Sequence, residues 1–162
     1  MDPELIAEKA RKSIGTYCFD ECKSYCCRKG FLVLNAKEAE LVTRGKVKEL
    51  EDKGVLKRLE TSGYSLNLAA LGHCPCLVDF KCSIHKDPGR PLACRQFPIF
   101  VFGNKVRISE RCMAMKDGKL YEFISQFIDS GYEVCDNVPF SELDFASLDI
   151  KNVGARKFLR KI

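Results

Sequence analysis

Cysteines are the residues of this sequence whose type and spacing could do chemistry, and there are ten of them among 162 residues. Four lie within the short stretch of residues 18–27, namely Cys18, Cys22, Cys26 and Cys27. Packing alone does not gather thiols in this way, because an isolated buried cysteine behaves as a small hydrophobic residue. Closely spaced thiolates are instead typical of zinc sites and iron–sulfur clusters. We therefore predict that the protein is built around metal.

A second group of cysteines follows in residues 73–98, a stretch rich in proline and glycine. This composition predicts an irregular loop, which suits a metal site because the metal would supply the rigidity. His73 and His85 lie close to cysteines of this loop. Thiolates are too soft a set for magnesium or calcium, so the alternatives are Zn²⁺ and an iron–sulfur cluster of the 4Fe–4S type. Disulfide bonds are the competing interpretation.

The net charge argues only weakly for a nucleic-acid partner. The formal charge is +5 when every thiol is neutral. Eight thiolates that hold two dications would change this charge by −4 and leave about +1. Much of the positive charge would therefore balance the negative charge of the thiolates, and nucleic acid is an unlikely partner.

The sequence shows no signal for export or for a membrane. Acidic residues stand at the N-terminus where a signal peptide is basic, and no apolar run approaches the roughly 18 residues of a membrane span. We therefore expect a cytoplasmic protein without a membrane partner. Thiols in the reducing cytoplasm bind metals more often than they form disulfides.

Hydrophobic periodicity predicts an α+β fold in a single domain over residues 1–162. Helices are expected at residues 3–15, 36–44, 46–53 and 118–130. Strands are expected at residues 31–34 and in two hairpins, 55–60 with 64–68 and 99–102 with 105–109. A turn of helix near 141–147 and a basic terminal helix would complete a helical C-terminal part, residues 117–162.

Several residues mark the ends and faces of these helices. Asn35 and Glu38 form a capping-box pattern, Gly15 is expected to end the first helix, and Asp117 to cap the helix of residues 118–130. One stripe of that last helix should face the core: Leu120, Phe123, Ile124, Phe127 and Ile128.

Three short motifs extend the cysteine pattern. They are Cys74-Pro75-x-Leu77, Cys82-Ser83-Ile84, and Arg90-Pro91-x-x-Cys94-Arg95-x-Phe97-Pro98. Together with the first cluster they resemble the YkgJ-type cysteine-cluster family over residues 17–112. The resemblance implies a zinc- or iron-chelating domain, and a flagellin lysine methylase carries the same pattern. Position by position it implies eight metal ligands: Cys18, Cys22, Cys26, Cys27, Cys74, Cys82, Cys94 and Cys112.

The sequence also departs from the family pattern. The cysteines of the first cluster are separated twice by three residues, where the family commonly has two. Cys76 and His85 stand where the family commonly has aromatic residues, and Cys135 lies outside the pattern. Cys76 and Cys135 are expected to be packing thiols, with ligation as the alternative. The roles of His73 and His85 stay open.

The adjacent residues Cys26 and Cys27 bear on the number of metal centres. In an extended backbone their sulfurs would point to opposite faces and serve two centres. In a helical turn they would diverge by about 100° and could share one cubane cluster. Eight thiolates would equally suit two tetrahedral zinc ions. Each arrangement closes loops of about fifty residues, so metal removal should unfold the domain.

Two functions remain open at this stage. The first is an intracellular metal-binding protein whose metal is structural or carries electrons. The alternative is an enzyme like a protein methyltransferase, which uses S-adenosylmethionine at an iron–sulfur site. Cys18-x3-Cys22 matches the start of the radical S-adenosylmethionine signature, but the next cysteine comes one residue late. A protein partner is compatible with either function.

Overall fold

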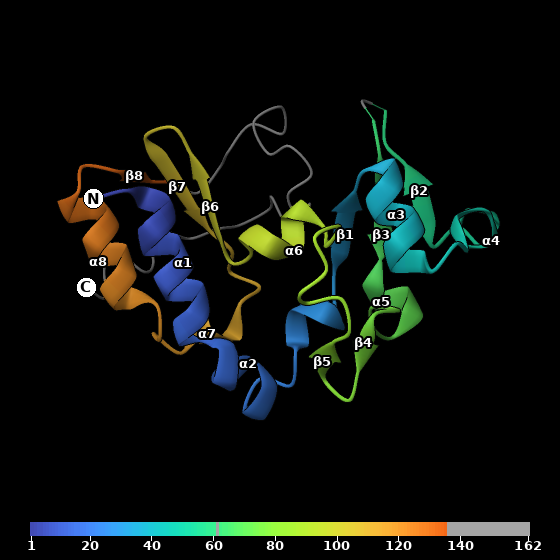
Figure 1. Cartoon of the computed structure of the whole chain (residues 1–162), viewed down its shortest axis with the longest axis horizontal. Coiled ribbons are helices and arrows are strands. Elements are labelled where there is room, and N and C mark those ends of the chain that lie inside the picture. Colours follow the sequence, from blue (N-terminus) through green and yellow to red (C-terminus); the bar gives the residue numbers. More distant parts are fainter. Residues whose placement is uncertain (61, 136–162) are drawn as a thin grey trace. The chain divides into compact units, whose positions relative to one another are not determined.

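The computed structural model describes residues 1–60 and 62–135, and it confirms the predicted α+β fold class (Figure 1). The described chain divides into two compact units. The first unit contains residues 1–23 and 96–135, and the second contains residues 24–95. The prediction of one domain over residues 1–162 stays a prediction, because residues 136–162 lie outside the described part.

The first unit combines helices with a small sheet. Its elements are α1 (Pro3–Ser13), α2 (Gly15–Asp20), β6 (Ile99–Phe102), β7 (Lys105–Ile108), α7 (Met113–Lys116), α8 (Tyr121–Asp129) and β8 (Glu133–Val134). Strands β6 and β7 form the predicted antiparallel hairpin. Strand β8, which was not among the predicted elements, pairs with β7 in parallel.

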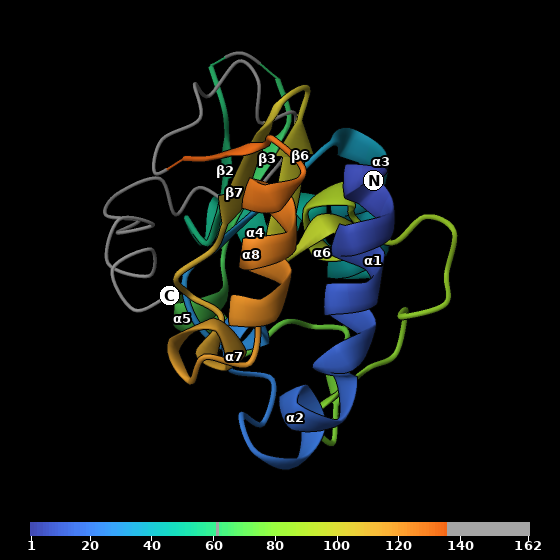
Figure 2. The same ribbon diagram turned by 90° about the vertical axis from the view of Figure 1, so that its left-hand side faces the viewer.

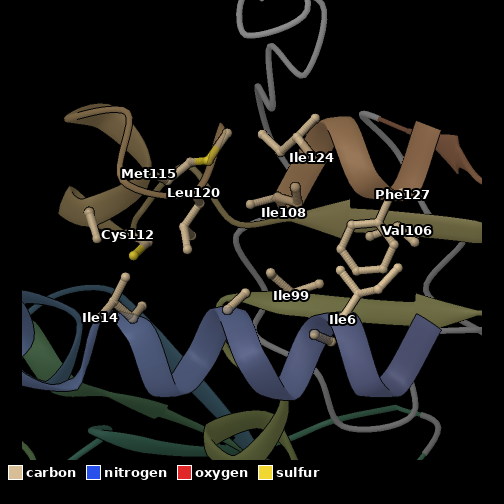
Figure 3. Packing of buried hydrophobic residues seen from close by; sticks show 13 residues of the cluster. Ile6, Ile14, Ile99, Val106, Ile108, Cys112, Met115, Leu120, Ile124 and Phe127 are labelled. Carbon is tan, nitrogen blue, oxygen red and sulfur yellow. The ribbon is translucent and has the colours of Figure 1, made fainter. Parts of the chain in front are cut away.

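The apolar faces of α1 and α8 hold the first unit together. The two helices lie side by side (Figure 2). Their buried residues meet those of β6 and β7 in one core, where Ile6, Ile99 and Phe127 are fully buried (Figure 3). Burial of each such side chain contributes about 1.5–3 kcal/mol.

The first helix ends earlier than predicted. Helix α1 begins after Asp2, whose side chain accepts a hydrogen bond from the backbone N–H of Glu4 at 2.9 Å. It ends at Ser13, and Gly15, which was expected to stop the helix, begins α2 instead. Ile14, the residue between the two helices, is buried. The consequence is that Cys18 lies on a helix.

Helix α8 begins later than predicted, and Asp117 does not cap it. Asp117 follows α7, and its carboxylate accepts a hydrogen bond from the hydroxyl of Tyr17. Leu120 stands at the N-cap of α8 without a side-chain cap. Of the predicted apolar stripe, Phe127 is buried as expected, but Ile128 is 41% exposed.

The second unit is built on a three-stranded antiparallel sheet of order β1-β3-β2. Leu66 in the central strand pairs with Leu32 on one side and Leu56 on the other, and all three leucines are buried. The elements of this unit are η1 (a 3₁₀ turn, Tyr25–Cys27), β1 (Phe31–Leu34), α3 (Ala36–Thr43), α4 (Val47–Asp52), β2 (Leu56–Arg58), β3 (Tyr64–Asn67), α5 (Leu68–Leu71), β4 (Leu77–Val78), β5 (Lys81–Cys82) and α6 (Leu92–Gln96), whose last residue belongs to the first unit.

Most of the second unit matches the predictions. The strand at residues 31–34, the hairpin of β2 and β3, and the helices α3 and α4 are confirmed. The capping box is confirmed too, because Asn35 and Glu38 exchange hydrogen bonds between side chain and backbone, each at 2.8 Å. The cysteine loop of residues 73–98 is less irregular than predicted, since it contains the hairpin of β4 and β5 and the helix α6.

Two predictions concern the C-terminal part. The turn of helix near 141–147 and the basic terminal helix lie outside the described residues. No helix within residues 1–60 and 62–135 is long and apolar enough to cross a membrane.

Candidate metal centre

In the second unit, four cysteines come from separate segments of the chain, and the charge of one of them affects the pKa values of the other three. Charge interactions link Cys27 of η1 to Cys74, which follows α5, to Cys82 of β5 and to Cys94 of α6. The backbone N–H of Cys74 also donates a hydrogen bond to the carbonyl of Cys27 at 2.7 Å. We call Cys27, Cys74, Cys82 and Cys94 the four-thiol set.

Hydrogen bonds between distant segments position these cysteines. The hydroxyl of Ser24, just before η1, donates to the carbonyl of Phe80 at 2.5 Å. Phe80 lies in the two-residue turn that leads into Cys82, with a left-handed φ of 63° that a bulky residue rarely adopts. This contact therefore joins the segment of Cys27 to the hairpin of Cys82.

Helix α6, which carries Cys94, is fixed through α3. The backbone N–H of Leu92, the first residue of α6, donates to Oε1 of Glu38 at 2.9 Å. Ala93 is buried in the same hydrophobic cluster as Ala39 and Val42 of α3. Glu38 thus caps its own helix and also orients the helix of Cys94.

The surroundings of three of these thiols, those of Cys74, Cys82 and Cys94, raise their pKa values. Burial, followed by the charge of Cys27, raises the pKa of the Cys94 thiol to about 12. Burial also raises the pKa of Cys82. For Cys74, a hydrogen bond with the Cys76 thiol comes first and burial second, and both raise its pKa. A cation at the set would favour the thiolate forms.

Arg90 supplies positive charge at this place. Its guanidinium lowers the pKa values of Cys82 and Cys94, in opposition to burial. The Nε atom of Arg90 is buried and has no hydrogen-bond partner within the described part of the chain. A buried donor without an acceptor is costly. A metal–thiolate group would offer it sulfur acceptors, so the residues present fit such a group.

The sulfur atoms of the four-thiol set are not close enough together to bind one metal ion. Among residues 1–60 and 62–135, no three side chains of His, Cys, Asp or Glu come close enough to hold a metal ion. All ten cysteines are free thiols, the form from which metal ligation starts. Metal binding would have to draw the sulfurs together and replace their protons, as happens when binding and folding are coupled.

Cys76 has polar partners that the prediction of a packing thiol did not foresee. It is only 1% exposed and lies in the hydrophobic cluster of the second unit. Its Sγ donates a hydrogen bond to the carbonyl of Val42 at 3.6 Å. The hydrogen bond from Cys74 comes first and the charge of Arg44 also contributes, and together they lower the pKa of Cys76 to about 7. The Cys-x-Cys spacing is the sequence signal that could have shown this pair.

The first unit holds three of the remaining predicted ligands. Cys112 is buried in the core, with its sulfur beside Ile14 (Figure 3). Burial raises the pKa of Cys112, with a smaller contribution from the charge of Cys22. Cys18 packs against the same core. We call Cys18, Cys22 and Cys112 the three-thiol group.

The other candidates take different places. Cys26 shares the 3₁₀ turn with Cys27, so the two side chains leave the backbone about 120° apart. The Sγ of Cys135 donates to the carbonyl of Val106 at 3.7 Å, as a packing thiol would. His73 is exposed, with Nδ1 at 2.8 Å from the carbonyl of Cys74. The charge of Arg90 lowers the pKa of His85.

Comparisons of the chain with protein-family models, with curated proteins and with solved structures found no match. The functional conclusion therefore depends on the thiols themselves.

Proposed function

We propose that the protein binds metal through its cysteines, with the four-thiol set as the principal centre. The observation that carries this proposal is that the charge of Cys27 acts on Cys74, Cys82 and Cys94, three cysteines from separate segments of the same unit. Four thiolates are the ligand set of a structural zinc ion and equally of a 4Fe–4S cluster. The metal would be structural if zinc and could carry electrons if an iron–sulfur cluster.

The order of the ligands along the chain supports a structural contribution. Cys27 lies near the first residue of the second unit and Cys94 near its last described residue. A metal that joins them would therefore close most of that unit into a loop. Closing a long loop restricts the unfolded chain, and the binding free energy adds to the stability of the folded chain. Metal binding should therefore stabilise the fold.

Charge supports the same proposal. Four thiolates around one Zn²⁺ carry a net charge of about −2, which is costly to bury without compensation. The charge of Arg90 acts on both Cys82 and Cys94 and would offset part of this charge. Its buried Nε–H would donate to a ligand sulfur.

The resemblance to the YkgJ-type family is a further argument for this proposal. It implies eight ligands, of which four form the four-thiol set and three form the three-thiol group. We propose the three-thiol group as a second, weaker binding place, because it offers one sulfur fewer than a closed tetrahedral site needs.

Metal analysis of protein prepared without air tests the proposal. We expect bound zinc in a colourless protein, or iron and sulfide in a brown one with a broad visible absorption band. The Cys27→Ser variant should lose the metal of the four-thiol set. The matched control, Cys135→Ser, should keep it, because Cys135 lies outside the four-thiol set and its Sγ donates to the carbonyl of Val106. Wild-type protein without metal after loading with zinc or iron and sulfide would contradict the proposal.

The same preparation separates this function from the enzymatic alternative. Titration of S-adenosylmethionine into the metal-loaded protein should release no binding heat if the metal is structural. Measurable binding would favour the methyltransferase-like enzyme.

A further inference from the structure

The hairpin of β4 and β5 exposes apolar side chains at its tip. Val78 and Phe80, which belong to the second unit, are 51% and 43% exposed. Asp79 and Phe80 form the two-residue turn of the hairpin, and both have left-handed φ angles, 48° and 63°. Such turns commonly contain asparagine, aspartate and glycine, because a bulky side chain is strained in this conformation. The needs of the turn therefore do not explain a phenylalanine at this place.

A second segment of the same unit holds the Phe80 ring beside a cation. The hydroxyl of Ser24 donates a hydrogen bond to the carbonyl of Phe80 at 2.5 Å. The guanidinium carbon of Arg28 lies 6.0 Å from the centre of the Phe80 ring and 5.8 Å from the centre of the Tyr25 ring. A cation at such a distance over an aromatic ring is attracted to it. Two aromatic rings and one guanidinium therefore form a single, partly exposed cluster.

Two further cations stand next to this cluster along the chain. Lys29 follows Arg28 and Lys81 follows Phe80, and both lysines are exposed. The acidic residue of the turn, Asp79, offsets only one of these three positive charges. The net charge of the whole chain, which argued against nucleic acid, does not show this local concentration. We call the following residues the ring–cation patch: Tyr25, Arg28, Lys29, Phe80 and Lys81.

We propose that the ring–cation patch binds single-stranded nucleic acid. Unpaired bases stack on exposed aromatic rings and on the planes of arginine guanidinium groups, and basic side chains pair with the phosphates. The hairpin and the 3₁₀ turn beside it offer rings, a guanidinium and lysines together. Stacking accepts every base, so the affinity should depend little on nucleotide sequence. This function is additional to metal binding and uses no thiolate.

The position of Asp79 favours nucleic acid over an anionic membrane surface as the occupant. Insertion of Val78 and Phe80 into a membrane would carry the carboxylate of Asp79, which lies between them in the chain, toward the apolar layer. Moving a carboxylate out of water is costly. A base stacked on Phe80 leaves this carboxylate in water.

Fluorescence anisotropy with a labelled oligothymidylate of about twelve nucleotides tests the role of the ring, because single-strand sites commonly span fewer than about sixteen. The wild-type protein, used as purified, should bind the oligonucleotide at low salt. The Phe80→Leu variant should bind about tenfold more weakly, since leucine is apolar but offers no ring for stacking. The Phe80→Tyr variant keeps a ring and should retain the affinity. Circular dichroism checks that each variant is folded.

The dependence of the affinity on salt tests the role of the cations. Binding should weaken as salt rises, because each phosphate that pairs with a cation releases a counterion. The Lys81→Gln variant should reduce the slope of log affinity against log salt by about 0.7. Lys57→Gln is the matched control, since Lys57 is an exposed lysine on β2 of the same unit. It should leave the slope unchanged.

Several outcomes would overturn the ring–cation patch as a nucleic-acid site. They are no binding by the wild type, equal affinities of the wild type and Phe80→Leu, and equal affinities for the single strand and for a duplex of the same length. Binding to vesicles of phosphatidylcholine and phosphatidylglycerol, but not to the oligonucleotide, would assign the patch to a membrane surface instead. A protein that binds the oligonucleotide but never binds metal would refute only the metal-binding function.

Discussion

At the residue scale, Arg90 is the side chain that best explains how buried thiolates could be tolerated. It lies where its charge acts on both Cys82 and Cys94, and its buried Nε has no acceptor in the described residues. An arginine in this position would hold the ligands of a metal without contacting the metal. Such outer partners commonly affect metal affinity.

Replacement of Arg90 by alanine should weaken zinc binding. We expect a loss of about 10–100-fold, because the sulfurs lose their compensating charge and a hydrogen-bond donor. Competition with a chromogenic chelator measures the affinity. Arg58→Ala is the matched control, since Arg58 is an exposed partner of Glu51 in the same unit. Equal affinities of the two variants would show that Arg90 does not support the site.

Sequence alone could identify the thiols but not their neighbours. The spacing of the first cluster predicted ligands, yet only the fold shows that the charge of Cys27 acts on Cys74, Cys82 and Cys94. Cys76 was expected to pack in the core, and its partner Arg44 lies far away in the sequence. Contacts of this kind depend on folding and leave no local signal.

At the element scale, predictions succeeded where the determinants are local. Helix α3 carries its own capping box, and the hairpin of β6 and β7 has Gly103 with a φ of 57° in its turn. Helix α6 was missed because it is five residues long and its first N–H is held by Glu38, which lies 54 residues earlier than Leu92. Short elements of this kind form only through tertiary contacts.

Glu38 is therefore expected to stabilise two helices at once. Its side chain is 6% exposed, and its two oxygens accept from the N–H groups of Asn35 and Leu92. The Glu38→Gln variant keeps one oxygen, which can accept from only one of these two N–H groups. The other N–H group would face the side-chain NH₂ group of the glutamine, which cannot accept. The free energy of unfolding should fall by about 1–3 kcal/mol. Denaturant unfolding measures it, with Glu40→Gln on the exposed face of the same helix as control. A loss no greater than that of the control would refute this double role.

At the scale of the whole molecule, the first cysteine cluster is divided between the two units. Cys18 and Cys22 belong to the first unit, and Cys26 and Cys27 to the second. The boundary falls between Lys23 and Ser24, which both have positive φ angles, 52° and 54°. The sequence did not predict this division, because nothing in the spacing of the four cysteines separates one pair from the other. That metal removal unfolds the protein stays a prediction.

X-ray absorption at the metal edge is the most direct test of the central claim that sulfur atoms of the four-thiol set hold the metal. For the zinc-loaded protein we predict a first shell of sulfur alone, four atoms at about 2.3 Å, and for an iron-loaded protein a shell of sulfur with neighbouring iron atoms. The Cys27→Ser variant should lose a sulfur from this shell or lose the metal. A shell dominated by nitrogen or oxygen in the wild type would contradict the account.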